Sequence, residues 1–161
     1  MRQRITSNFL IRFIRLFRQS IKRPSDVSLA INIGYFVLTA PTRLAKTDLP
    51  NFLKEIRESQ PPVADGVQMA AERIIRLRRL WLWLPMLSSR NNCYIRALTL
   101  YRFLNSKKVD VRIHFGVEPG ISENDRLRGH AWVTVNGTIL EVPEPVPTGR
   151  VRTIYSHPQV N

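Results

Sequence analysis

Cysteine is almost absent from this chain of 161 residues, which contains only Cys93. A single cysteine cannot form an internal disulfide, so the sequence favours a reducing, cytoplasmic setting over secretion. Metal-ligand spacing is absent as well, because His114, His130 and His157 stand far apart and have only Cys93 as a thiolate partner. We therefore expect neither a metal centre nor another cofactor.

Acidic residues are scarce: 12 Asp and Glu stand against 25 Lys and Arg, which leaves a formal net charge of +13. Such an excess attracts an anionic partner, whether nucleic acid, acidic lipid, or an acidic protein or peptide, and the charge alone does not choose among them. The sequence shows no aromatic stacking pattern, no zinc-finger spacing and no clear helix-turn-helix. We therefore expect no nucleic-acid partner.

The sequence also has no apolar run long enough to predict a membrane span by itself. The apolar run over residues 27–40 covers 14 residues and includes Asn32 and Gly34, whereas a bilayer span needs about 20 residues. The residues before it, Pro24, Ser25 and Asp26, are typical of a helix start. The run therefore predicts a buried helix that begins near Pro24.

Residues 7–22 have the pattern of an amphipathic helix. Its apolar face would carry Leu10, Phe13, Ile14, Phe17 and Ile21, and its basic face Arg12, Arg15, Arg18 and Lys22. No continuous apolar region and no small-residue cleavage site follow the charges, so we do not expect a signal peptide. One interpretation is a helix packed on its own domain; the other is docking on a partner or on the inner face of the membrane.

The two halves of the chain differ in pattern. Helices are expected at Leu49–Glu58, at residues 66–84 with Arg73, Arg76, Arg78 and Arg79 on the outer faces, and at Cys93–Leu104. Alternating residues 109–117 predict a half-buried strand, and "HAWVTVNGTILEV" predicts two strands joined by a two-residue turn at Asn136-Gly137. We expect an α+β fold, with a helical region over residues 1–84 packed on a core over residues 85–161.

Cys93 stands at the start of its predicted helix. The positive end of a helix favours thiolate over thiol, and its free backbone N–H groups can stabilise an oxyanion on a substrate carbonyl. Asn91 and Asn92 would cap this helix or donate to that oxyanion, and Arg96 would raise the local positive potential or form a surface ion pair. A thiolate also needs a general base, and His130, at the start of the following strand, is the candidate.

An orienting acid would complete the site. With a two-residue turn, Glu141 lies opposite Trp132 and one diagonal step from His130, so the two side chains share a face. A bulge or a longer turn would shift this parity, in which case Glu144 would be the alternative. Each residue alone has a plainer interpretation: Cys93 as a small buried residue, His130 as a structural histidine and Glu141 as a solvated edge residue.

The stretches "CYIRALTLYRFL", "VDVRIHFGV" and "RGHAWVTVNGTIL" resemble the B-type proteins of lasso-peptide biosynthesis. The resemblance covers residues 90–142 and implies a transglutaminase-like core, related to papain-like sites in the order of its catalytic residues. It implies a cysteine peptidase that removes the leader of a ribosomally made precursor, with Cys93 as nucleophile and His130 as base. The family has an aspartate as its third residue, and Leu140-Glu141-Val142 stands in the matching region.

The resemblance also implies partners. The length fits the stand-alone peptidase, which works with a precursor peptide, a small leader-binding protein and a cyclase that closes the macrolactam ring. The same cysteine and histidine would also serve acyl transfer to an amine, and the sequence does not separate the two reactions. The alternative from another class is a non-catalytic basic protein, docking on membrane or nucleic acid through its first helix and residues 73–79.

Overall fold

The computed structural model describes residues 15–58, 66–90, 92–104, 109–118, 128–141 and 151–158. After a helical stretch at residues 15–20 come α2 (Pro24–Leu44), α3 (Leu49–Glu58), α4 (Val67–Leu82), the short 3-10 helix η1 (Pro85–Arg90) and α5 (Cys93–Phe103). The strands follow: β1 (Val111–Glu118), β2 (Arg128–Val135), β3 (Thr138–Ile139) and β4 (Arg152–His157). The predicted α+β class is confirmed, with helices first and an antiparallel sheet after the cysteine helix.

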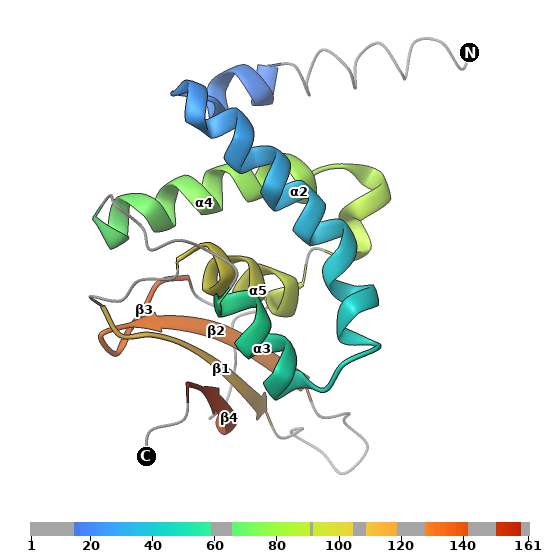
Figure 1. The fold of residues 1–161 in the computed structure, drawn as a ribbon, viewed down its shortest axis with the longest axis vertical. Coiled ribbons are helices and arrows are strands. Elements are labelled where there is room, and N and C mark those ends of the chain that lie inside the picture. Colours follow the sequence, from blue (N-terminus) through green and yellow to red (C-terminus); the bar gives the residue numbers. More distant parts are fainter. Residues whose placement is uncertain are drawn as a thin grey trace.

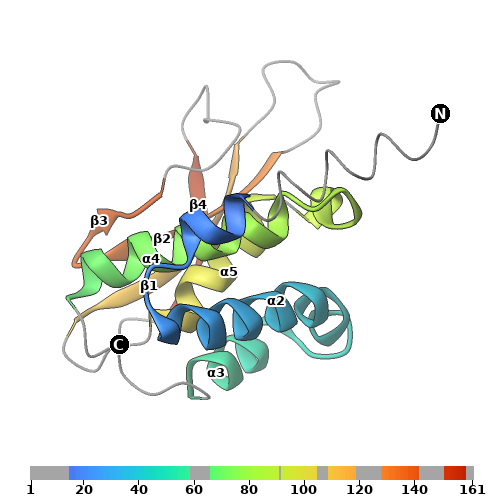
Figure 2. The same cartoon turned by 90° about the horizontal axis from the view of Figure 1, so that it is seen from above.

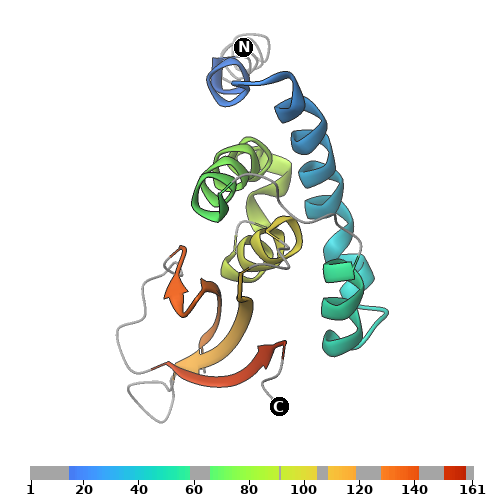
Figure 3. The same ribbon diagram turned by 60° about the vertical axis from the view of Figure 1, so that its left-hand side comes forward.

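Helix α5 lies at the centre of the fold. It packs on β1 and β2 on one side and contacts α2, α3 and α4 on the other (Figures 1 and 3). In these views every described helix lies on the same side of the sheet. The predicted division near residue 84, between a helical region and a core, stays a prediction.

Helices α2 and α4 lie side by side (Figure 2), and they approach closely at Gly34. A methyl group at Gly34 would lie only 2.2 Å from the ring of Trp81. The indole Nε1 of Trp81 donates a hydrogen bond to the Ala30 carbonyl at 2.7 Å, which fixes the ring across α2. Glycine is therefore required at this crossing for steric reasons.

Helix α2 begins at Pro24, as predicted, and continues past the apolar run 27–40, through Pro41, to Leu44. Within the described residues it is the one helix long and apolar enough to cross a membrane, and 33% of its apolar window is buried. Its buried face includes Ala30, Ile33, Phe36, Val37 and Ala40, and its outer face exposes Val27, Ile31, Tyr35 and Leu38. The helix thus contributes to the core and also presents an apolar surface.

The predicted amphipathic helix 7–22 lies partly outside the described residues, which begin at residue 15. Leu16 and Ile21 pack against the hydrophobic core, whereas Phe17 is 38% exposed. Arg15, Arg18 and Lys22 are all exposed. Packing on its own domain is therefore observed for the described part of this segment.

The sheet has the order β3-β2-β1-β4, and all its pairs are antiparallel. Val135 pairs with Thr138, so the turn at Asn136-Gly137 has two residues as predicted. Both turn residues have positive φ, 49° and 81°, which is the geometry that makes this dipeptide favourable in a tight hairpin. Strand β3 ends at Ile139, and β4, which pairs with β1, has no counterpart in the sequence-based expectations.

Candidate active site

Cys93 is the first residue of α5 and is partly exposed. Asn92 caps the helix: its side-chain oxygen accepts a hydrogen bond from the Ile95 backbone N–H at 2.9 Å. The N–H groups of Cys93 and Tyr94 belong to the first turn and have no acceptor within the helix. The structure therefore places the thiol at the positive end of α5, and it assigns Asn92 to capping rather than to donation from its side chain.

The sulfur of Cys93 lies at the start of β2. Cys93 Sγ donates to the Gly129 carbonyl oxygen across 3.7 Å, and Gly129 directly precedes His130. The beginning of the cysteine helix thus meets the beginning of the histidine strand. Among the residues that the structure describes, no hydrogen bond joins the side chains of Cys93 and His130.

His130 is only 3% exposed. Its Nε2 lies 3.2 Å from Oε2 of Glu118, whose side chain is also buried. Glu118 ends β1, and because Gly116 pairs directly with His130, Glu118 stands one diagonal step away on the same face. His130 Nδ1 is buried and has no hydrogen-bond partner among the described residues. The imidazole thus has one nitrogen held by a carboxyl group and one that is uncommitted.

Glu118 is the site residue that sequence reasoning missed. The strand predicted from alternation ends at residue 117, one residue before Glu118. Glu118 could be predicted as the partner of His130 only if the register in which β1 pairs with β2 were known. The connection between the two strands is long, and such a connection leaves the register unspecified.

Glu141 is not the partner of His130, so that expectation is wrong. Both of its carboxylate oxygens lie 2.7 Å from Nη2 of Arg78, and Oε1 lies 2.6 Å from Nη2 of Arg96. The turn has the predicted length, but β3 ends at Ile139 and Glu141 lies beyond it. The alternation of side chains along a strand therefore does not determine which face Glu141 points to. Two guanidinium groups on α4 and α5 hold the carboxylate instead. The alternative acid, Glu144, lies outside the described residues.

Arg78 was expected on an outer face of its helix, yet it is 1% exposed. Its Nη1 donates to the Arg96 carbonyl at 2.8 Å. Burial lowers the pKa of Arg78, and the charge of Glu141 opposes that shift. Burial also raises the pKa of Glu141, but Arg78 and Arg96 outweigh it and hold that pKa below its ordinary value. These three residues form a partly buried ion cluster that joins α4, α5 and the end of the hairpin.

The outer face of the sheet carries His114 and Trp132, whose rings stack at 5.4 Å. His114 is held by Ser156 Oγ at its Nδ1 and by Thr134 Oγ1 at its Nε2, both at 2.8 Å. Alternation along β2 places Trp132 on the face of His130, as expected, and opposite to the face that packs on α5. Both nitrogens of His114 are occupied, which fits a structural role for this residue.

Within the described ranges, no group of three or more His, Cys, Asp or Glu side chains is placed to hold a metal ion. The groups that the structure brings together at the site are a thiol on a helix start, an acid-held imidazole and backbone N–H donors. These are the components of nucleophilic acyl chemistry, in which a thiolate attacks a carbonyl and an imidazole handles the proton.

Residues 36–156 match the family described as the Transglutaminase-like superfamily. The chain belongs to this superfamily. The matched segment extends from α2 to β4 and includes Cys93, His130 and Glu118. Members of the superfamily are generally cysteine peptidases or transglutaminases, so the fold is one that supports thiol-dependent peptide hydrolysis or acyl transfer. Comparison with curated proteins and with solved structures finds no match.

Proposed function

We propose that this protein is a cysteine peptidase that removes the leader from a ribosomally made lasso-peptide precursor. The observation that carries the proposal is the placement of Cys93 at the start of α5, in contact with the residue that precedes His130, within a transglutaminase-like chain. The choice of a leader peptidase within this superfamily rests on the resemblance of residues 90–142 to the lasso B-type proteins.

The proposed reaction begins at the sulfur. The Cys93 thiolate attacks the scissile carbonyl, and the first-turn N–H groups of α5 stabilise the oxyanion. His130 stands on the face of β2 away from α5, so it would take the thiol proton through Nδ1 past Gly129, which carries no side chain, and give it to the leaving amine. Water then hydrolyses the thioester and regenerates the thiol. Nδ1 is assigned this task because Nε2 is already held by Glu118.

Glu118 acts as a positioning residue in this scheme. A carboxyl group on one imidazole nitrogen fixes the ring orientation and the tautomer, and it stabilises the imidazolium that forms during proton transfer. Burial of both side chains strengthens this interaction, because the local dielectric constant is lower than that of water. Glu118 thus takes the place that the sequence had suggested for Glu141.

The partners are part of the proposal. The substrate is a precursor peptide presented by a small leader-binding protein, and a lasso cyclase consumes the freed amine. Residues 7–22 would contact a partner or the membrane surface through their basic face, on which Arg15 and Arg18 are exposed. The apolar outer face of α2 lies in the same part of the chain and would add to such a contact.

The proposal is tested by mass spectrometry of a precursor incubated with this protein and its leader-binding partner. We expect Cys93→Ala to abolish leader removal and His130→Ala to be as damaging, because members of one catalytic unit do not act additively. His114→Gln is the matched control, since His114 lies on the same sheet face and has no proposed part in the reaction. Normal cleavage by Cys93→Ala, with far-ultraviolet circular dichroism confirming the fold, would overturn the mechanism.

Acyl transfer is the second candidate, and the superfamily match favours it, since transglutaminases pass the same thioester to an amine. The reaction differs only in the group that resolves the thioester. Adding a primary amine such as glycine ethyl ester to the cleavage reaction separates the two functions. A peptidase yields a free carboxylate on the leader, whereas a transferase yields the amide of the added amine.

A further inference from the structure

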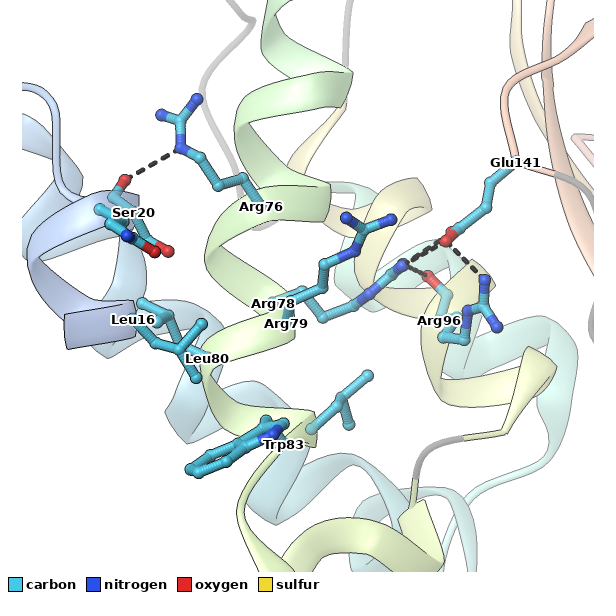
Figure 4. A pocket seen from close by; sticks show the side chains of 11 residues that line it. Leu16, Ser20, Arg76, Arg78, Arg79, Leu80, Trp83, Arg96 and Glu141 are labelled. Atoms are coloured by element: carbon cyan, nitrogen blue, oxygen red, sulfur yellow. Dashed lines mark hydrogen bonds and ion pairs between the residues drawn. The ribbon is translucent and has the colours of Figure 1, made fainter. Parts of the chain in front are cut away.

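A pocket of about 600 Å³ opens between residues 15–20, α4 and α5 (Figure 4). Its polar side is formed by arginines and one glutamate, and its apolar side by leucines and a tryptophan. The lining residues that carry the argument are Arg76, Arg78, Arg79, Arg96, Glu141 and Trp83. This volume is in the range of small-ligand sites and far exceeds the size of a single inorganic anion.

The charge of this pocket is unbalanced. Four arginines line it, and the one acid in the lining, Glu141, is shared between Arg78 and Arg96, as Figure 4 shows. Arg76 uses Nε for the Ser20 carbonyl at 2.9 Å and Nη2 for Asp26 at 3.4 Å, and a guanidinium has five N–H donors. A second anion would find donors here that the fold has not used.

Arg79 and Arg76 supply those donors most directly. Arg79 is exposed and makes no hydrogen bond or ion pair within the described part of the chain. Arg76 has donors left, because its hydrogen bonds to Ser20 and Asp26 use only Nε and one N–H of Nη2. A bound carboxylate would form charge-assisted hydrogen bonds with these groups.

The pocket lies next to the candidate active site. Arg96 and Glu141 line it and also line a small cavity of about 10 Å³ against Cys93. A ligand in the arginine pocket would therefore extend toward the thiol along α5. The apolar side of the pocket is formed in part by Leu80 and Trp83. Contact with this side would contribute binding free energy for apolar side chains of a peptide, but not for a hydrated inorganic ion.

We propose that this pocket binds an acidic side chain of the peptide whose bond Cys93 attacks, with Arg79 and Arg76 as the principal ligands. The assignment rests on the proposed peptidase function and adds a specificity determinant to it. A substrate peptide would place an aspartate or glutamate in the pocket and its scissile bond at the start of α5.

The test uses two fluorescein-labelled hexapeptides, one with two adjacent glutamates between leucines and the other with glutamines in their place. Binding is measured by fluorescence anisotropy on the Cys93→Ala protein, so that no peptide is consumed. We expect the glutamate peptide to bind about tenfold more tightly, as a charge-assisted hydrogen bond implies. Arg79→Gln should remove most of this difference, and Arg79→Lys should retain part of it.

Arg112→Gln is the matched control, because it removes one positive charge from β1, a strand that contributes no residue to the pocket lining. Equal weakening by Arg79→Gln and Arg112→Gln would mean that only the overall positive field attracts the peptide, which would overturn the proposal. Equal affinity for the two peptides would overturn it as well. Competition by inorganic phosphate as strong as that by unlabelled glutamate peptide would leave a simple anion site and contradict the assignment to a peptide.

The connection to the thiol has its own measurement. In the native protein, the glutamate peptide should slow alkylation of Cys93 by iodoacetamide, and the glutamine peptide should not. Binding without such protection would contradict a substrate site. Cleavage of the precursor by Cys93→Ala would contradict the peptidase function itself. That result is measured in a different assay from peptide binding, so failure of the peptidase function and failure of the pocket assignment are distinguishable.

Discussion

His130 and its acid define the chemistry at the scale of single residues. The imidazole is buried, and Glu118 holds one nitrogen at 3.2 Å, so we assign ring orientation to Glu118. We expect Glu118→Gln to lower single-turnover leader removal by about 100-fold or more, because loss of the orienting acid permits the wrong tautomer. Glu118→Asp should restore part of the rate.

The control for this prediction is Glu141→Gln, which removes the acid that the sequence had favoured. Its carboxylate belongs to Arg78 and Arg96, so we expect turnover by the folded variant to change little. An equal loss of turnover in both variants, or a loss in Glu141→Gln alone, would return Glu141 to the catalytic site.

Glu141 should instead affect the free energy of unfolding. Its pKa is lower in the folded protein than in the unfolded chain, so its contribution is complete above the unfolded pKa of about 4.3 and is lost as pH falls below it. We expect the unfolding free energy, measured by urea denaturation, to decrease from about pH 6 to about pH 3. The decrease should be smaller in Glu141→Gln than in the native protein. At neutral pH this variant leaves Arg78 buried without its counter-ion, which typically costs about 3–5 kcal/mol.

At the scale of elements, the helices were predictable because their apolar residues recur at helical spacing. The bounds of α3 agree with the prediction, and α5 differs only at its last residue. The hairpin at Asn136-Gly137 was predictable from a dipeptide that tolerates positive φ. Strand β4 was missed, because "RTIYSH" is short, largely exposed, and stabilised by pairing with a strand distant in sequence.

The site was predictable only in part, for the same reason. Cys93 and His130 stand at element starts, and local sequence indicates such positions. The partners of Glu141 and His130 depend on how α4, β1 and the hairpin end meet, which is tertiary information. Arg78 illustrates this: its position within an arginine-rich helix suggested a solvated face, whereas a carboxylate from residue 141 compensates its burial.

Helix packing yields a prediction at Gly34. A methyl group there would overlap the Trp81 ring, which is tied to α2 by its hydrogen bond to Ala30. We expect Gly34→Ala to lower the unfolding free energy by about 1–3 kcal/mol, despite the better helix propensity of alanine. Asn32→Ala, on the exposed side of α2, is the control and should be neutral or slightly stabilising in urea denaturation. Unchanged stability of Gly34→Ala would show that the ring can move aside.

At the scale of the whole molecule, the fold joins a basic helical layer to a small antiparallel sheet through α5. The thiol stands where that helix meets the sheet, and the arginine pocket lies beside it between the helices. This arrangement explains why a strongly basic chain (+13) need not bind nucleic acid. Part of its positive charge lines a pocket next to the candidate active site, where an acidic peptide would gain most from it.

The most direct test of the central claim is the rate at which iodoacetamide alkylates Cys93 at neutral pH, followed by intact-protein mass spectrometry. The chain has one cysteine, so every adduct reports this thiol. A thiol at a helix start that shares its proton with His130 should react about tenfold faster or more than an unassisted thiol, and His130→Ala should lose most of that advantage. Equal rates for the native protein and His130→Ala would contradict a Cys93–His130 catalytic pair.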